Sequence, residues 1–77
     1  MYHRLILDYL THYQPELKAA LRAEGTLEPY LAEQGAAMQE AKQRIITQIA
    51  ESDPQLSPLQ REMEAEQQVR EMFLPLP

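Results

Sequence analysis

The stretch that decides the fold is G25-T-L-E-P-Y-L-A-E-Q34, because it can end one helix and begin another. Gly25 lacks the Cβ atom that makes left-handed backbone costly, so it suits a helix C-terminus. Thr26 carries a hydroxyl that can cap the next helix. Pro29 then falls in the first turn, where amide groups have no acceptor within the helix. We therefore predict a stop followed by a start in a packed bundle, not one broken helix.

A long helix is predicted from Leu27 to about Glu51. Its apolar residues recur every three or four positions, and the opposite side carries polar residues that include Glu40 and Lys42. Gly35 begins a notch of small residues, which indicates close packing against a neighbouring helix, with a hinge as the alternative. The apolar stripe consists of Leu27, Tyr30, Leu31, Met38, Ala41, Ile45 and Ile49.

The N-terminal segment carries a similar stripe that is interrupted by Pro15. A proline inside a helix removes a hydrogen bond and clashes with the preceding turn. The stripe nevertheless continues in phase through Leu17, Ala20 and Leu21. We expect a single helix that is kinked near Tyr13 and ends at Glu24, and the alternative is a second helix that begins at Pro15. The stripe before the proline consists of Tyr2, Leu5, Ile6, Tyr9, Leu10 and Tyr13.

The C-terminal third contains a second stop and start. Asp53-Pro54 ends the long helix, because the residue before a proline avoids helical backbone. Ser57-Pro58 begins a third helix, with Gln60 placed for a capping box, and the helix runs to about Phe73. Residues 74–77, Leu-Pro-Leu-Pro, form either a flexible tail or an apolar strap. The expected stripe of the third helix is Leu59, Met63, Val69, Met72 and Phe73.

These patterns predict an all-α fold: one domain over residues 1–77, built as a small three-helix bundle with a kinked first helix, a long second helix and a shorter third helix. A chain of 77 residues buries only about 60% of its unfolded surface, so its core is marginal. The chain has no cysteine, which excludes disulfides as a source of stability. Self-association, as a homodimer, is therefore predicted to complete the core.

The charge balance excludes several classes of partner. A net charge of −5 argues against tight binding to phosphate backbones, so direct binding to nucleic acid is not expected. Lys42, Arg44, Arg61 and Arg70 alternate with acids, which is typical of a solvated surface laced with ion pairs. No apolar run approaches the ~20 residues of a membrane span, and the N-terminal run is too short for a signal peptide. We expect a soluble, cytoplasmic protein.

Few residues suggest chemistry. Asp8, His12 and Glu16 are spaced four apart and could share a helical face as an acid–base or metal site, but Pro15 lies between the last two. Exposed polar residues on the outer face of an amphipathic helix are the default explanation for all three. The sequence has no glycine-rich phosphate loop and no serine nucleophile motif. We predict no enzyme activity, no catalytic, cofactor-binding or metal-binding residues, and no small-molecule substrate.

The order of residues resembles the family of transposon-encoded proteins called TnpV. The resemblance covers a little over half of the chain, is looser over V69-R-E-M72, and is broken by Pro15, where the family has a plainer helix. It implies a protein encoded on a mobile element, of unsettled biochemical role and without catalytic residues. The matching segments are D8-Y-L-T-H-Y13, Gly25-Thr26-Leu27, Y30-L-A32, Ala41 and R44-I-I-T-Q-I49.

Two functional hypotheses follow. The first is a small non-enzymatic interaction module, an accessory or regulatory protein of a mobile element that dimerises or docks on another protein through apolar helix faces. The alternative is a DNA-associated accessory factor in transposition or its regulation, with a helix–turn–helix around E24-G-T26. The length of the second helix and the acidic charge argue against direct reading of bases.

Overall fold

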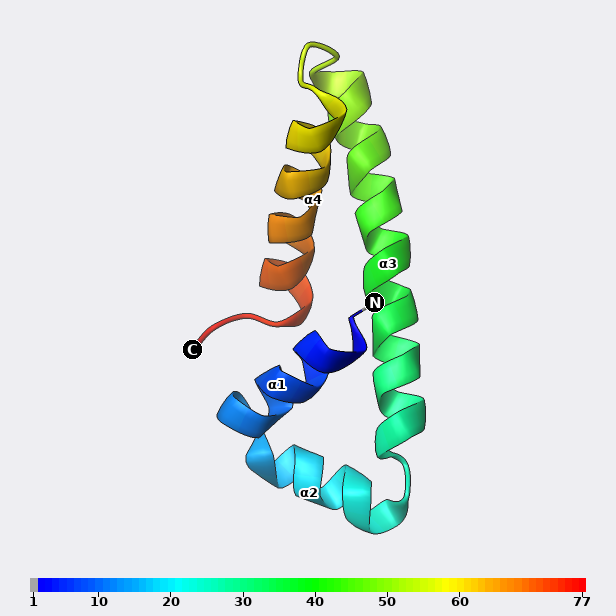
Figure 1. Cartoon of the computed structure of the whole chain (residues 1–77), viewed down its shortest axis with the longest axis vertical. Coiled ribbons are helices and arrows are strands. Elements are labelled where there is room, and N and C mark those ends of the chain that lie inside the picture. Colours follow the sequence, from blue (N-terminus) through cyan, green and yellow to red (C-terminus); the bar gives the residue numbers. More distant parts are fainter. Residues whose placement is uncertain (1) are drawn as a thin grey trace. The chain divides into compact units, whose positions relative to one another are not determined.

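The computed structural model describes residues 2–77, which form four α-helices and no strand (Figure 1). The helices are α1 (His3–Tyr13), α2 (Pro15–Glu24), α3 (Leu27–Ser52) and α4 (Pro58–Phe73). The all-α class is confirmed, but the predicted count of three helices is wrong. The chain divides into an N-terminal unit, residues 1–37 with residues 76–77, and a C-terminal unit, residues 38–75.

The additional helix arises at Pro15. α1 ends at Tyr13 and α2 begins at Pro15, while Gln14 between them has non-helical backbone angles, φ −138° and ψ 56°. The prediction of a single kinked helix is therefore wrong. The reason is that proline disfavours helical backbone in the residue before it, yet fits the first position of a new helix well. None of the 10 residues of α2, all of them described, is buried.

The end of α2 at Gly25 forms as the sequence predicts. Gly25 adopts left-handed backbone with φ 73° and donates its N–H to the Arg22 carbonyl at 3.1 Å. The Thr26 N–H donates to the Leu21 carbonyl at 2.9 Å, which completes a Schellman motif. The Thr26 hydroxyl donates to that same carbonyl at 3.3 Å. This bond stabilises the end of α2, whereas we predicted that Thr26 would cap the start of α3.

The core of the N-terminal unit joins α1 to the first part of α3. Ile6 and Leu10 on α1 are buried, and so is Leu31 on α3. Gly35 lies beside α1: a Cβ atom there would lie 3.9 Å from the Tyr2 Cβ and 4.0 Å from the Ile6 Cδ1. The small residue therefore sits in a helix contact, in agreement with the packing interpretation.

The space around Gly35 leads to a first prediction. The distances above are ordinary van der Waals contacts, so alanine fits without displacing α1. Glycine inside a helix is up to about 1 kcal/mol less favourable than alanine. We expect Gly35→Ala to raise the free energy of unfolding by about 0.5–1 kcal/mol in urea denaturation, whereas Gly35→Leu lowers it. A less stable alanine variant would contradict this packing.

The C-terminal unit is a helical hairpin. The second part of α3 and α4 run side by side in opposite directions, joined by the loop that the proline residues enforce (Figure 1). The predicted capping box is confirmed: the Gln60 N–H donates to the Ser57 Oγ at 3.2 Å, and the Ser57 N–H donates to the Gln60 Oε1 at 3.1 Å. The buried apolar residues of this unit are Met38, Ala41, Ile45, Ala65 and Val69.

The predicted apolar stripe of α4 is only partly correct. Val69 is fully buried, but its buried neighbour one turn earlier is Ala65, which the stripe did not include. Leu59, Met63 and Met72 are exposed.

Candidate interaction surface of the C-terminal hairpin

The exposed apolar residues of α4 include a pair of side chains one turn apart. Leu59 and Met63 are 66% and 63% exposed. At about 100° per residue, they lie roughly 100–140° around the helix from the buried line through Ala65 and Val69. α4 therefore carries two apolar stripes, of which the helices of its own unit bury one.

The second part of α3 repeats this arrangement. Ile46 and Ala50 are half-buried and lie roughly 90–130° around the helix from the buried line through Met38 and Ile45. On each helix, the second stripe is reached from the buried line by rotating in the same direction, counted along the chain. Because the two right-handed helices run in opposite directions, these rotations bring both second stripes to the same side of the hairpin. We call this surface, formed by Ile46, Ala50, Leu59 and Met63, the hairpin face.

An ionic cluster bridges the two helices on this side of the hairpin. Lys42 is only 5% exposed, and its Nζ lies 3.0 Å from the Glu66 Oε2 and 3.3 Å from the Glu62 Oε1. The Glu66 Oε1 accepts a hydrogen bond from the Arg70 Nε at 3.2 Å. A lysine is rarely buried unless it is paired, and here two carboxylates provide the compensation. The two cations and two anions cancel, so the cluster carries no net charge.

The burial of Lys42 corrects the sequence analysis, which assigned this residue to the solvated side of the long helix. The residue stands at the border of the apolar stripe, directly after Ala41. The sequence does contain a hint of this burial, because Glu62 and Glu66 are spaced one turn apart on the following helix and could compensate a lysine between two helices. The hint can be used only when it is known that these two helices pack together.

The possible acid–base group on the first helix does not assemble. The His12 Nδ1 lies 2.8 Å from the backbone carbonyl oxygen of Asp8, where it bonds to the main chain and not to the carboxylate. Glu16 belongs to the next helix, beyond the break at Gln14. Within residues 2–77, no group of three or more His, Cys, Asp or Glu side chains is placed to hold a metal ion.

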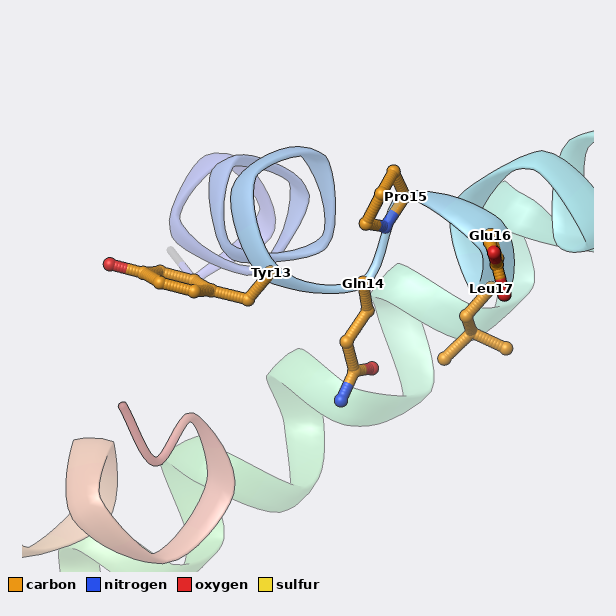
Figure 2. Close-up of a pocket in the computed structure, with 5 residues that line it drawn as sticks. All are labelled: Tyr13, Gln14, Pro15, Glu16 and Leu17. Atoms are coloured by element: carbon orange, nitrogen blue, oxygen red, sulfur yellow. The ribbon is translucent and has the colours of Figure 1, made fainter. Parts of the chain in front are cut away.

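A shallow hollow lies at the break between α1 and α2. It is lined by the five consecutive residues 13–17 and is open to solvent (Figure 2). The side chains of Tyr13 and Leu17 lie on either side of Gln14, and the Tyr13 ring contacts the Tyr9 ring at 5.2 Å between centroids. Ligand sites normally combine an enclosed apolar cavity with convergent polar groups. The open hollow lacks that enclosure and gives no support to a small-molecule site.

Comparison with protein-family models, with curated proteins and with solved structures found no match. The resemblance to the transposon-encoded family therefore stays a prediction from the sequence. Among the helices formed by residues 2–77, none is both long and apolar enough to cross a membrane.

Proposed function

We propose that this chain is a small non-enzymatic interaction protein that works through protein–protein contacts and associates with itself as a homodimer. The observation that carries the proposal is the hairpin face. Single exposed apolar residues are normal on a protein surface, but Leu59 and Met63 are exposed one turn apart on α4. They lie on the same side of the hairpin as the half-buried Ile46 and Ala50 of α3, and contiguous apolar patches mark interaction sites.

The size of the chain supports the same proposal. With 77 residues and no disulfide, the free energy available from its own core is small. The large side chains that are fully buried are only Ile6, Leu10, Leu31, Met38 and Val69 among the described residues. A partner that covers further apolar area adds stability that the isolated chain lacks.

Sedimentation equilibrium across a dilution series tests self-association. We expect a species of twice the 8.9 kDa chain mass at high concentration, which dissociates on dilution. Because a folded chain this small is marginal, the melting temperature should also rise with protein concentration. A strictly monomeric protein up to about 1 mM, with a melting temperature that does not depend on concentration, would contradict the proposal.

An accessory or regulatory role in a mobile element is a further part of the proposal and is supported by the sequence resemblance. The alternative, a DNA-associated accessory factor, needs cationic side chains that are free to meet phosphates. Lys42 is buried between carboxylates, and Arg44 and Arg70 are in ion pairs with Glu40 and Glu66. We expect no change in fluorescence anisotropy of a long duplex at low salt. Salt-dependent binding would favour the alternative.

A further inference from the structure

We infer that the hollow at the break between α1 and α2 binds a short, extended, proline-containing segment of another protein, with a lysine or arginine beside its prolines. The hollow is lined by residues 13–17 and lies within the N-terminal unit. The inference goes beyond the proposed function, because it names a partner by its chemistry and does not depend on self-association or on the hairpin face.

Aromatic rings form one side of the hollow. The Tyr13 side chain is 47% exposed, and its ring lies 5.2 Å from the Tyr9 ring and 6.4 Å from the His12 ring, measured between centroids. Leu17, which is 39% exposed, lies on the other side of Gln14 (Figure 2). Proline-rich segments dock on surfaces lined by aromatic side chains, and their extended backbone is largely formed before binding. The exposed rings therefore suit a proline-containing partner.

Gln14 offers hydrogen bonds that an extended segment can use. Its backbone N–H donates to the Leu10 carbonyl at 3.0 Å, and its own carbonyl accepts from the Lys18 N–H at 3.1 Å. Its exposed side-chain amide makes no hydrogen bond within residues 2–77. A polyproline-type backbone has no internal hydrogen bonds, so its carbonyls can accept from this amide, whereas the carbonyls of a helix already accept within the helix. The amide therefore favours an extended partner over a helical one.

The charge at the hollow favours a cationic partner. Glu16 is exposed and forms no ion pair with any of the residues that the structure describes. Lys18 is only two residues away, but at about 100° per residue the two side chains leave α2 on nearly opposite sides. The Lys18 Nζ donates instead to the Thr11 Oγ1 at 2.9 Å. A lysine or arginine in the bound segment can therefore pair with Glu16, whereas a second copy of this chain, with a net charge of −5, is repelled.

The hollow is small and held in shape. The bond from Lys18 to Thr11 and the two backbone bonds of Gln14 join α1 to α2 across the break. A surface that is already ordered loses little conformational entropy on binding, so a few contacts are enough for a weak complex. Stable interfaces between folded proteins bury about 800 Å² on each partner, far more than five consecutive residues provide. The size therefore fits a short segment and not the face of a folded domain.

Nuclear magnetic resonance titration of isotope-labelled protein tests the inference, with the synthetic peptide Ala-Pro-Pro-Leu-Pro-Arg-Pro-Ala as the probe. We expect shifts concentrated in the backbone amide signals of Tyr13, Gln14, Glu16 and Leu17 and in the side-chain amide signals of Gln14, with a dissociation constant below about 1 mM. One control peptide has glutamate in place of arginine, and a second has alanine in place of every proline. Each should bind at least about 10-fold more weakly, which corresponds to the loss of one charge-assisted contact or of the preformed backbone.

Charge exchange separates a direct contact from an indirect effect. Glu16→Lys should weaken binding of the arginine peptide at least about 10-fold and should bind the glutamate peptide more tightly than the wild-type protein does. Tyr13→Ala should weaken the arginine peptide by a similar factor, because it removes the most exposed ring of the hollow. The matched control is Leu59→Ala, an exposed residue of α4, which should leave the affinity unchanged. Circular dichroism should show unchanged helicity in all three variants.

The outcomes also distinguish the other possible occupants. Absence of shifts at residues 13–17 with about 2 mM arginine peptide would overturn the inference. Equal binding of the alanine peptide would indicate a helical occupant, and changes in the same signals on dilution of the protein alone would indicate a second copy; either result would overturn it as well. A monomeric wild-type chain would overturn the proposed homodimer and leave this inference standing, whereas a dimer that does not bind the peptide would overturn only the inference.

Discussion

Glu62→Gln/Glu66→Gln should lower the free energy of unfolding by about 3 kcal/mol. The amides are close in size to the carboxylates, so the substitutions remove charge and leave packing nearly intact. Lys42, which is only 5% exposed, then loses the two carboxylates that lie 3.0 and 3.3 Å from its Nζ. Removal of one side of a buried ion pair is strongly destabilising for this reason. For a domain of this size the loss corresponds to a fall in melting temperature of roughly 12–24 °C.

Lys42→Met should behave quite differently, and it provides the matched control. It removes the buried charge and fills the same space with an apolar side chain. The carboxylates that remain cost less free energy than an uncompensated buried ammonium. Removal of one side of an ion pair is costly when the charge left behind is buried. Here Glu62 is exposed to water, and Glu66 still pairs with Arg70 at 3.2 Å. We expect a change within about 1 kcal/mol.

The triple variant Lys42→Met/Glu62→Gln/Glu66→Gln completes the comparison. If the carboxylates act by compensating the lysine, their removal should be far less damaging once the lysine is absent, and most of the lost stability should return. Urea denaturation of the four proteins measures the coupling. Equal losses from the glutamine substitutions in the wild-type and Lys42→Met backgrounds would show that the ion pairs contribute nothing specific.

The ends of the helices could be predicted from the sequence because their chemistry is local. The left-handed glycine Gly25 and the Ser57–Gln60 capping box depend on a few neighbouring residues, and both form as predicted. The break at Pro15 was misjudged because the apolar stripe continues in phase across it. Periodicity reports which face is apolar, and it does not report whether the backbone hydrogen bonds are continuous.

The candidate surface could be predicted only in part because it depends on tertiary contacts. α4 has apolar residues on two sides, and the sequence alone did not distinguish the buried Ala65 and Val69 from the exposed Leu59 and Met63. The burial of Lys42 likewise depends on carboxylates 20 and 24 residues further along the chain. Propensity and periodicity do not include such pairings, so a residue that scores as polar can still become part of the interior.

The contribution of the N-terminal core can be measured with two leucines in different environments. Leu31 on α3 is 1% exposed and packs in the N-terminal unit, whereas Leu59 on α4 is largely exposed. Leu31→Ala removes the same atoms as Leu59→Ala but leaves a cavity among fixed neighbours, and such substitutions cost about 2–5 kcal/mol. We expect Leu31→Ala to lower the free energy of unfolding by at least about 2 kcal/mol, enough to leave a marginal domain partly unfolded at room temperature.

Leu59→Ala should change the stability of the folded monomer by less than about 0.5 kcal/mol, because it removes atoms that water already contacts. Its effect should instead grow with protein concentration if the proposed dimer buries this side chain. Thermal unfolding at a low and a high protein concentration separates the two cases: Leu31→Ala lowers the melting temperature equally at both, and Leu59→Ala lowers it mainly at the high one. An equal effect of the two substitutions at the low concentration would mean that α4 packs with Leu59 inward, and the hairpin face would then not exist as an open surface.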